Sequence, residues 1–183
     1  MNSRPNGRLF WGAAIAVVVL DLVSKQLAMD HLRPEHVPHQ ILGNVVRFTL
    51  AFNQGAAFSM SVGNHSRYFF GALAIVALVI LYRLFRVTKS GDTLRTLALG
   101  LAWGGAAGNL IDRFRSARGV VDFIDIGVGD VRFWTFNVAD SAVTVGALLL
   151  AWVLWREDRR ALAIAAAEAA ARDSSRTAEA ASS

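Results

Sequence analysis

Four uncharged apolar runs, separated by polar segments, dominate the chain. They cover residues 9–20, 68–82, 96–111 and 141–155. Each run is shorter than the roughly 20 residues that a helix needs to cross the hydrocarbon core of a bilayer. Each spanning helix must therefore include polar residues from its flanks, among them Asp21 and Asp140. We predict four helices, near residues 9–28, 68–86, 94–113 and 138–156.

The composition supports this prediction of a membrane protein. The 183 residues are 54% hydrophobic and 18% charged, which is more apolar than a soluble domain of this size usually is. Arg4 and Arg8 precede the first run, as in a secretory signal peptide, but no small-x-small cleavage site follows it. Three further runs also argue against a secreted product. Because cysteine is absent, disulfides, thiolate zinc sites and cysteine nucleophiles are excluded.

Basic residues predict the orientation. They are dense at both ends of the chain and between the second and third runs, at Arg4, Arg8, Arg83, Arg86, Lys89, Arg95, Arg156, Arg159 and Arg160. The 39 residues of loop 29–67 contain only Arg33, Arg47 and Arg67. Cytoplasmic loops carry the excess of Lys and Arg. Both termini are therefore expected in the cytoplasm, although Arg115, Arg118 and Arg132 in the other outer loop weaken the bias.

Four crossings place the polar residues of distant segments on one membrane face. The end of the first span, both long loops, the end of the third span and the start of the fourth all meet there. The polar residues of these segments are Asp21, Lys25, Asn53, Asn109, Asp112, Arg113, Asp122, Asn137 and Asp140. We therefore expect a single site assembled from them.

The outer loops contain strand patterns. In residues 45–53, Val46, Phe48, Leu50 and Phe52 alternate with polar or small residues, which predicts a half-buried strand. In the second loop, residues 123–126 and 131–136 flank Gly-Val-Gly-Asp at 127–130, which predicts a hairpin. The expected fold is an all-α membrane protein of four transmembrane helices with a small extramembrane β-sheet. After Trp155 the chain is Ala-rich and charged, and should extend the fourth helix before fraying.

Two aspartates, Asp122 and Asp140, lie in nearly charge-free surroundings beside the predicted spans. A carboxylate that reaches the helix centre costs about 2.5–3.5 kcal/mol on insertion scales, so a functional role is the default hypothesis. Two such groups suggest an acid and base pair. Structural roles remain open for several of the polar residues: Asp21 and Lys25 can neutralise each other four residues apart on one helical face. Asn137 and Asp140 resemble an N-cap and an acidic N3 residue.

Further alternatives concern the third helix and the histidines. Asn109, Asp112 and Arg113 could brace neighbouring segments or contact a substrate, and Gly100, Gly104 and Gly108 are typical of close helix packing. All four histidines lie in the first loop, where Pro34 and Pro38 prevent a regular metal-binding helix. Ser24 and Lys25 diverge by about 100° on a helix and cannot easily form a nucleophile and base pair. Gly127–Asp130 matches the Gly-x-Gly-Asp pattern of presenilin-type proteases, but a hairpin turn is the favoured interpretation.

Five blocks in order resemble the lipoprotein signal peptidases, or type II signal peptidases. They are Asp-Leu-Val-Ser-Lys at 21–25, Asn-Gln-Gly-Ala-Ala-Phe-Ser at 53–59, Gly-Gly-Ala-Ala-Gly-Asn-Leu-Ile-Asp-Arg at 104–113, Val-Val-Asp-Phe at 120–123 and Phe-Asn-Val-Ala-Asp-Ser at 136–141. The resemblance implies an aspartic endopeptidase of the bacterial inner membrane. It would remove signal peptides from diacylglyceryl-modified prolipoproteins by cutting before the lipidated cysteine. It carries the catalytic pair onto Asp122 and Asp140, and supporting roles onto Asn53, Asn109, Arg113 and Asn137.

This interpretation completes the set of sequence-based expectations. Residues 1–160 form the peptidase domain, with periplasmic loops 29–67 and 114–137, and residues 161–183 form a partly disordered cytoplasmic tail. Asp21, Lys25 and Asp112 join the supporting residues. No metal or other cofactor is expected; the partners are the prolipoprotein substrates and membrane lipids, without nucleic acid, and the protein is a monomer. The alternatives are a proton or ion carrier, which would need polar residues through the full membrane depth, and an assembly or scaffold protein, which would not need paired aspartates.

Overall fold

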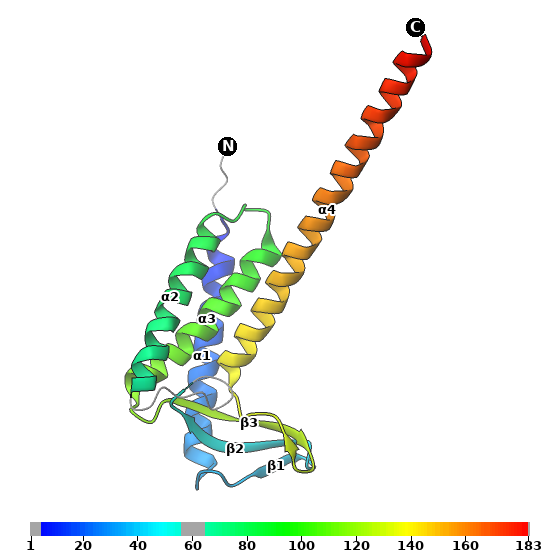
Figure 1. Ribbon diagram of the computed structural model, residues 1–183. Helices are drawn as coiled ribbons and strands as arrows, with labels where there is room; N and C mark the ends of the chain where they lie inside the picture. The colour runs from blue at the N-terminus through cyan, green and yellow to red at the C-terminus, as the bar shows by residue number, and fades with distance from the viewer. Residues whose placement is uncertain (1–4, 56–64, 183) are drawn as a thin grey trace.

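The computed structural model describes residues 5–55 and 65–182, and the side chains of these up to residue 169 (Figure 1). It has four helices and a four-stranded sheet across one end of them. The helices are α1 (Gly7–His31), α2 (Ser66–Arg86), α3 (Thr93–Arg115) and α4 (Val138–Ser182). The strands are β1 (His39–Leu42), β2 (Val46–Asn53), β3 (Val120–Val128) and β4 (Val131–Arg132). Residues 56–59 of the second matching sequence block lie outside the described residues.

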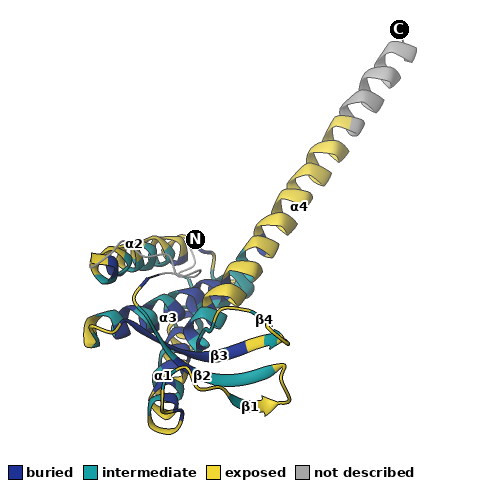
Figure 2. Cartoon of the chain, turned by 60° about the horizontal axis from the view of Figure 1, so that its bottom comes forward, coloured by how far each residue is buried: buried dark blue, intermediate teal, exposed yellow. Residues whose placement is uncertain are grey.

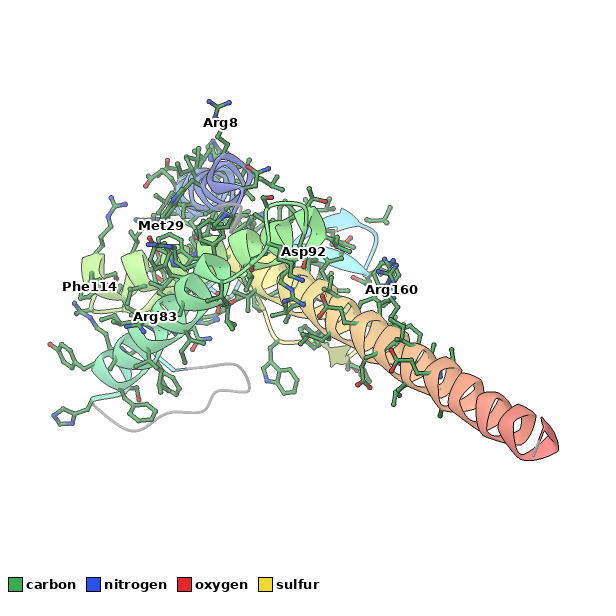
Figure 3. The ribbon with its side chains drawn as sticks, turned by 90° about the horizontal axis from the view of Figure 1, so that it is seen from above. Arg8, Met29, Arg83, Asp92, Phe114 and Arg160 are labelled. Carbon is green, nitrogen blue, oxygen red and sulfur yellow. The ribbon has the colours of Figure 1, made fainter. Side chains whose placement is uncertain are left out.

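The four predicted helices are all present. Among the described residues, three helices are long and apolar enough to cross a membrane, namely α1, α2 and the part of α4 over residues 138–169. The fourth, α3, contains several glycines and alanines among its large apolar residues, and lies between the other three helices when the bundle is seen from above (Figure 3). A helix shielded by its neighbours needs less apolar surface toward lipid, which explains its lower hydrophobicity.

Glycines allow α3 to approach α1 closely. A Cβ atom added at Gly100 or Gly104 would lie 2.8 Å from the carbonyl oxygen of Phe10 or 2.7 Å from that of Ala14. At Gly108 it would lie 2.6 Å from Asp21 Oδ2. The three glycines therefore line the α1 contact, as the packing interpretation predicts, and Gly108 makes room for a buried carboxylate.

The sheet is antiparallel, in the order β1-β2-β3-β4. The predicted hairpin is confirmed: Val128 pairs with Val131, and the two-residue turn begins at Gly129, whose φ of +57° suits a hairpin turn. The predicted strand over 45–53 is confirmed as β2. However, one extra residue between Phe48 and Ala51 forms a bulge against β3, and the strict alternation expected from sequence is interrupted there.

The sheet packs on the end of α1. Ala28 of α1 and Leu32, the residue that caps its C-terminal end, form a buried cluster with Leu50 of β2 and with Val121 and Phe123 of β3. These contacts fix β3 against the helix bundle. They also hold the segment of β3 between Val121 and Phe123 beside the N-terminal turn of α4.

The last helix extends far beyond the bundle. It runs without interruption to Ser182, which confirms the predicted helical extension after Trp155. Residues 156–169 are exposed throughout, as the yellow part of α4 in Figure 2 shows. The predicted fraying and partial disorder of the chain end stay predictions.

Candidate active site

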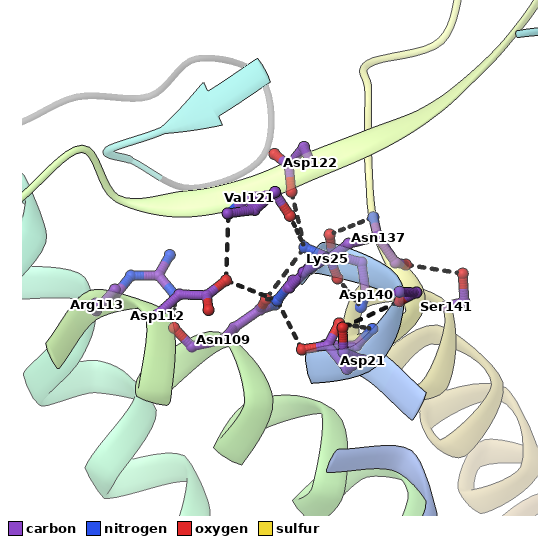
Figure 4. Close-up of polar contacts among 12 residues, drawn as sticks. Asp21, Lys25, Asn109, Asp112, Arg113, Val121, Asp122, Asn137, Asp140 and Ser141 are labelled. Atoms are coloured by element: carbon purple, nitrogen blue, oxygen red, sulfur yellow. Dashed lines mark hydrogen bonds and ion pairs between the residues drawn. The ribbon is translucent and has the colours of Figure 1, made fainter. Parts of the chain in front are cut away.

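Asp122 in β3 and Asp140 in the first turn of α4 come together at the end of the bundle that the sheet covers (Figure 4). Asn137 binds both carboxylates. Its side-chain Nδ2 donates to Asp122 Oδ1 at 2.7 Å, and its backbone N–H donates to Asp140 Oδ2 at 3.2 Å. One fully buried residue thus sets the relative position of the two acidic groups.

The same residue caps α4. Asn137 Oδ1 accepts a hydrogen bond from the backbone N–H of Asp140 at 2.9 Å, while the Asp140 carboxylate accepts from the backbone of Asn137. This reciprocal arrangement is a capping box with aspartate at N3. The helix-cap interpretation of the sequence is therefore confirmed. It is also compatible with chemistry, because each capping residue keeps a further contact inside the site.

Two more asparagines donate to the carboxylates. Asn53 Nδ2 lies 3.2 Å from Asp122 Oδ2, and Asn109 Nδ2 lies 2.8 Å from Asp140 Oδ1. The Asn109 side chain is itself oriented, because its Oδ1 accepts from Lys25 Nζ at 3.0 Å. Each aspartate therefore receives a directed amide N–H from a different structural element, which stabilises its ionised form.

Burial dominates the electrostatics of Asp122, whose exposed fraction is 3%. Burial, followed by the negative charge of Asp140, raises the pKa of Asp122 from 3.8 to about 7, although hydrogen bonds from Asn53 and Asn137 act in the opposite direction. Two carboxyl groups that oppose each other's ionisation titrate as a pair. A proton shared by the two carboxyl groups near neutral pH is the state that general acid and base catalysis needs.

A second buried cluster lies directly beside this pair. Lys25 Nζ contacts Asp21 Oδ2 at 2.7 Å and Asp112 Oδ2 at 2.8 Å, which with Asn109 gives its three N–H groups three partners. The predicted neutralisation of Asp21 by Lys25 is present. Asp112 joins it as a second acidic partner.

The two acidic partners of Lys25 also position the backbone on either side of the site. Asp21 Oδ1 accepts from the backbone N–H of Ala139 at 2.9 Å, and Asp112 Oδ2 accepts from that of Val121 at 3.2 Å. Ala139 and Val121 are the residues immediately before Asp140 and Asp122. A single lysine is thus connected, through two carboxylates, to the backbone that carries each candidate catalytic residue.

Arg113 binds carbonyl groups, which fits the bracing role considered for it. Its Nη2 donates to the carbonyl oxygen of Gly55 at 2.8 Å, and its Nη1 donates to that of Asn109 at 3.1 Å. It therefore connects α3 to the chain that follows β2. Sequence reasoning missed the contribution of Gly55, because the acceptor is a backbone carbonyl with no side-chain signal.

A third charged cluster, in the sheet, was also missed. Asp125 is clamped by Arg47 at 2.8 Å and by Arg132 at 2.8 Å, and it accepts from Thr49 Oγ1 at 3.2 Å. Arg47 and Asp125 are directly paired across β2 and β3. Their opposite charges in adjacent predicted strands would have revealed the contact only if the strand register had been known.

A multi-pass helix bundle with paired carboxylates under a small sheet defines a class of membrane enzyme. Two solved structures described as bacterial membrane enzymes share this fold. One has a TM-score of 0.76 and 28% identity over 86% of this chain and 94% of its own. The other has a TM-score of 0.72 and 29% identity over 84% and 97%.

Sequence comparisons narrow this class to one family. The family described as signal peptidase (SPase) II matches residues 13–156. A lipoprotein signal peptidase of Coxiella burnetii is 42% identical over 140 residues, covering 75% of this chain and 83% of the relative. One from Geobacillus kaustophilus is 41% identical over 143 residues, covering 77% and 88%. The chain belongs to the signal peptidase II family, which confirms the sequence-based prediction and gives no support to a proton or ion carrier.

Proposed function

We propose that this protein is an aspartic endopeptidase that removes signal peptides from diacylglyceryl-modified prolipoproteins, with Asp122 and Asp140 as the catalytic pair. The observation that carries the assignment is the bridge through Asn137, which binds both carboxylates at 2.7 and 3.2 Å. The family relationship supports the peptidase activity, and the paired acidic groups supply a chemistry for it. The cut falls before the lipidated cysteine.

The reaction uses one shared proton. Below about pH 7 the shared proton resides on Asp122, whose pKa is raised to about 7, and Asp140 acts as the general base. Asp140 takes a proton from water as the water oxygen attacks the scissile carbonyl carbon, while Asp122 donates its proton to the carbonyl oxygen. When the C–N bond breaks, the proton held by Asp140 passes to the leaving amine. One hydroxyl group of the tetrahedral intermediate then returns its proton to Asp122 as the carbonyl of the new carboxyl group re-forms.

Supporting residues hold this geometry without sharing in proton transfer. Asn53 and Asn109 direct the carboxylates, and Asn137 links them. Asp21, Lys25 and Asp112 fix the backbone before each aspartate, and Arg113 holds the carbonyl of Gly55. Preorganised groups of this kind avoid reorganisation during the reaction.

The lipid part of the substrate binds between helices. An apolar cavity of about 180 Å³ lies between α2 and α3, lined in part by Gly71, Ile75 and Leu110, with Arg113 at its edge. It has room for a segment of an acyl chain near Arg113, which supports the active site. Binding energy from such a remote part of the substrate can position the peptide over the dyad.

The topology follows the charge bias of the loops. All four helices cross the bacterial inner membrane, both termini are cytoplasmic, and the sheet with the active site is periplasmic. Arg83, Arg86, Lys89 and Arg95 around the α2–α3 connection support this orientation. The protein acts as a monomer, without metal or other cofactor, and residues 161–183 form a cytoplasmic tail.

Cleavage of a lipidated precursor by purified protein tests the catalytic pair. Asp122→Asn and Asp140→Asn should each reduce kcat by about 10²–10⁴-fold, because each removes a proton-transfer role but little volume. Asp30→Asn is the matched control, since Asp30 is an exposed aspartate near the same end of the bundle, and it should retain activity. Substantial cleavage by either dyad variant would defeat the assignment.

A second assay tests the substrate class. A precursor with an unmodified cysteine should be cut far more slowly than the diacylglyceryl form in the same detergent, at matched subsaturating concentrations. Burial of an acyl chain contributes about 0.8 kcal/mol per methylene, so loss of even part of two chains should outweigh any single peptide contact. Equal rates would refute lipid-dependent positioning while leaving the dyad intact.

A further inference from the structure

The sheet extends sideways beyond α4 and ends in two adjacent turns (Figure 1). One turn joins β1 to β2 after Leu42, and the other joins β3 to β4 after Val128. The backbone N–H of Gly127 donates to the carbonyl of Val45 at 2.9 Å, so the two turns lie side by side. Together they form the outer tip of the sheet.

Large apolar side chains cover this tip. Val128 is 73% exposed and Val131 is 82% exposed, on either side of the β3–β4 turn. We call the following exposed residues the tip surface: Ile41, Leu42, Val128, Val131, Phe133 and Trp134. Six large apolar side chains exposed around two adjacent turns indicate a protein or membrane interaction site.

The tip surface cannot easily fold inward, because ion pairs fix the strands behind it. Asp125 binds Arg47 and Arg132, and Arg132 Nη1 also donates to the carbonyl of Asn44 in the β1–β2 turn. Although burial raises the pKa of Asp125, hydrogen bonds from Arg132 and Arg47 hold it below its ordinary value. The clamp therefore stays ionised and joins both turns into one rigid edge.

The start of α4 limits how far the tip surface can lie from the membrane. Trp134 precedes Val138, the first residue of α4, by four positions, so it lies within about 14 Å of it even for a fully extended chain. Further along this helix Trp155 carries Arg159 at 5.7 Å from its ring centroid. About 17 residues at 1.5 Å each separate Val138 from Trp155, or roughly 26 Å, close to the thickness of a hydrocarbon core. Trp134 and Trp155 therefore flank a segment of α4 of about that length, and tryptophan is enriched at both interfaces of a membrane.

We propose that the tip surface inserts into the boundary between headgroups and acyl chains of the phospholipid leaflet on the active-site side. The occupant is lipid because the tip surface reaches to within about 14 Å of Val138 at Trp134, and the exposed residues Val145 and Leu148 of the helix that starts there are apolar. Its role is to anchor β3, the strand that carries Asp122, at a fixed height above the bilayer. The proposal concerns the sheet and goes beyond the peptidase assignment.

Tryptophan fluorescence in vesicles tests the insertion without any measurement of cleavage. The full chain is prepared with Trp134 as its single tryptophan, by replacing Trp11, Trp103, Trp152 and Trp155 with phenylalanine, in phosphatidylcholine vesicles with or without bromine at carbons 6 and 7 of an acyl chain. Brominated lipid should quench Trp134 severalfold more than a matched water-exposed position. That control is Leu162→Trp in a chain otherwise free of tryptophan, on the projecting part of α4.

A double variant tests whether the apolar side chains of the tip surface cause the quenching by lipid. Val128→Asp with Val131→Asp, in the chain containing only Trp134, should weaken bromine quenching and increase quenching by aqueous acrylamide, with helix content unchanged. Two results would overturn the proposal. Acrylamide quenching of Trp134 equal to that of the Leu162→Trp control, without bromine quenching, would place the tip in water, and protection from both quenchers would show that a protein surface covers it.

Discussion

Two clusters of carboxylates lie side by side in this protein, and they differ in how their charge is compensated. Asp21 and Asp112 share the ammonium group of Lys25 at 2.7 and 2.8 Å. Asp122 and Asp140 receive amide N–H groups, and in the described part of the chain neither forms an ion pair. The first cluster contains its own cation, whereas the second contains a carboxyl group that can gain or lose a proton near neutral pH.

From this difference we infer a structural role for the first cluster and a catalytic role for the second. A buried ion pair with three hydrogen-bonded partners holds its charge state and fixes geometry. A pair of carboxyl groups hydrogen-bonded to neutral donors can change its protonation state near neutral pH, which is what acid and base catalysis requires. Both clusters contain unusual concentrations of acidic groups, and in the second the pKa of Asp122 is raised to about 7.

Removing the cation should have the largest effect on stability. Lys25→Met leaves Asp21 and Asp112 buried without their cation and should lower the free energy of unfolding by about 3–5 kcal/mol. Lys89→Met, at an exposed position, should stay within about 0.5 kcal/mol of the parent. Denaturation in detergent measures both. Replacing all three charged residues by Asn, Met and Asn should recover much of the loss, and a single Lys25→Met protein as stable as the parent would abolish the contrast between the clusters.

Asp122→Asn should instead change how the stability of the protein depends on pH. Because the pKa of Asp122 is raised from 3.8 to about 7, its contribution to stability is present below pH about 4 and is lost as the pH rises through about 7. The loss amounts to at most roughly 4 kcal/mol. Unfolding of the parent should therefore become easier between pH 4 and 7, and Asp122→Asn should reduce this slope. An unchanged slope in the variant would mean that Asp122 is ionised throughout.

Asn137 should show a smaller effect on stability and a distinct effect on activity. Asn137→Ala removes the cap of α4 and should cost about 1 kcal/mol. Asn6→Ala is a matched control, since Asn6 Oδ1 caps α1 by accepting from Leu9 N–H at 3.1 Å. Both variants should melt at similarly reduced temperatures, but only Asn137→Ala should lose kcat. Equal activities would show that Asn137 is a cap and nothing more.

Local patterns predicted much of the fold. Apolar runs predicted four helices, Gly-Val-Gly-Asp at 127–130 between apolar segments predicted the hairpin, and the spacing of Asn137 and Asp140 predicted the cap. Even the clustering of polar groups followed from simple topology, because successive helices of a bundle place alternate connections at one end.

The remaining features depend on contacts between distant residues. The bond from Ala139 N–H to Asp21 joins residues 118 positions apart, and no local pattern encodes it. The bulge in β2 and the short strand β1 depend on register against neighbours rather than on alternation. The lower hydrophobicity of α3 makes sense only after its central position is known. Sequence therefore identifies the acidic residues, and the packing of α1, α3 and β3 distinguishes their roles.

The pH dependence of kcat/KM for a lipidated precursor, measured between pH 5 and 9, tests the shared-proton dyad most directly. The parent should lose activity as pH rises through about 7, because Asp122 gives up the proton that the carbonyl oxygen needs. Asn53→Ala removes a donor that stabilises the Asp122 carboxylate at 3.2 Å, so it should raise the pKa of Asp122 and move this falling limb to higher pH. A parent profile that stays flat or rises from pH 6 to 9, or a limb that moves to lower pH in Asn53→Ala, would contradict the dyad.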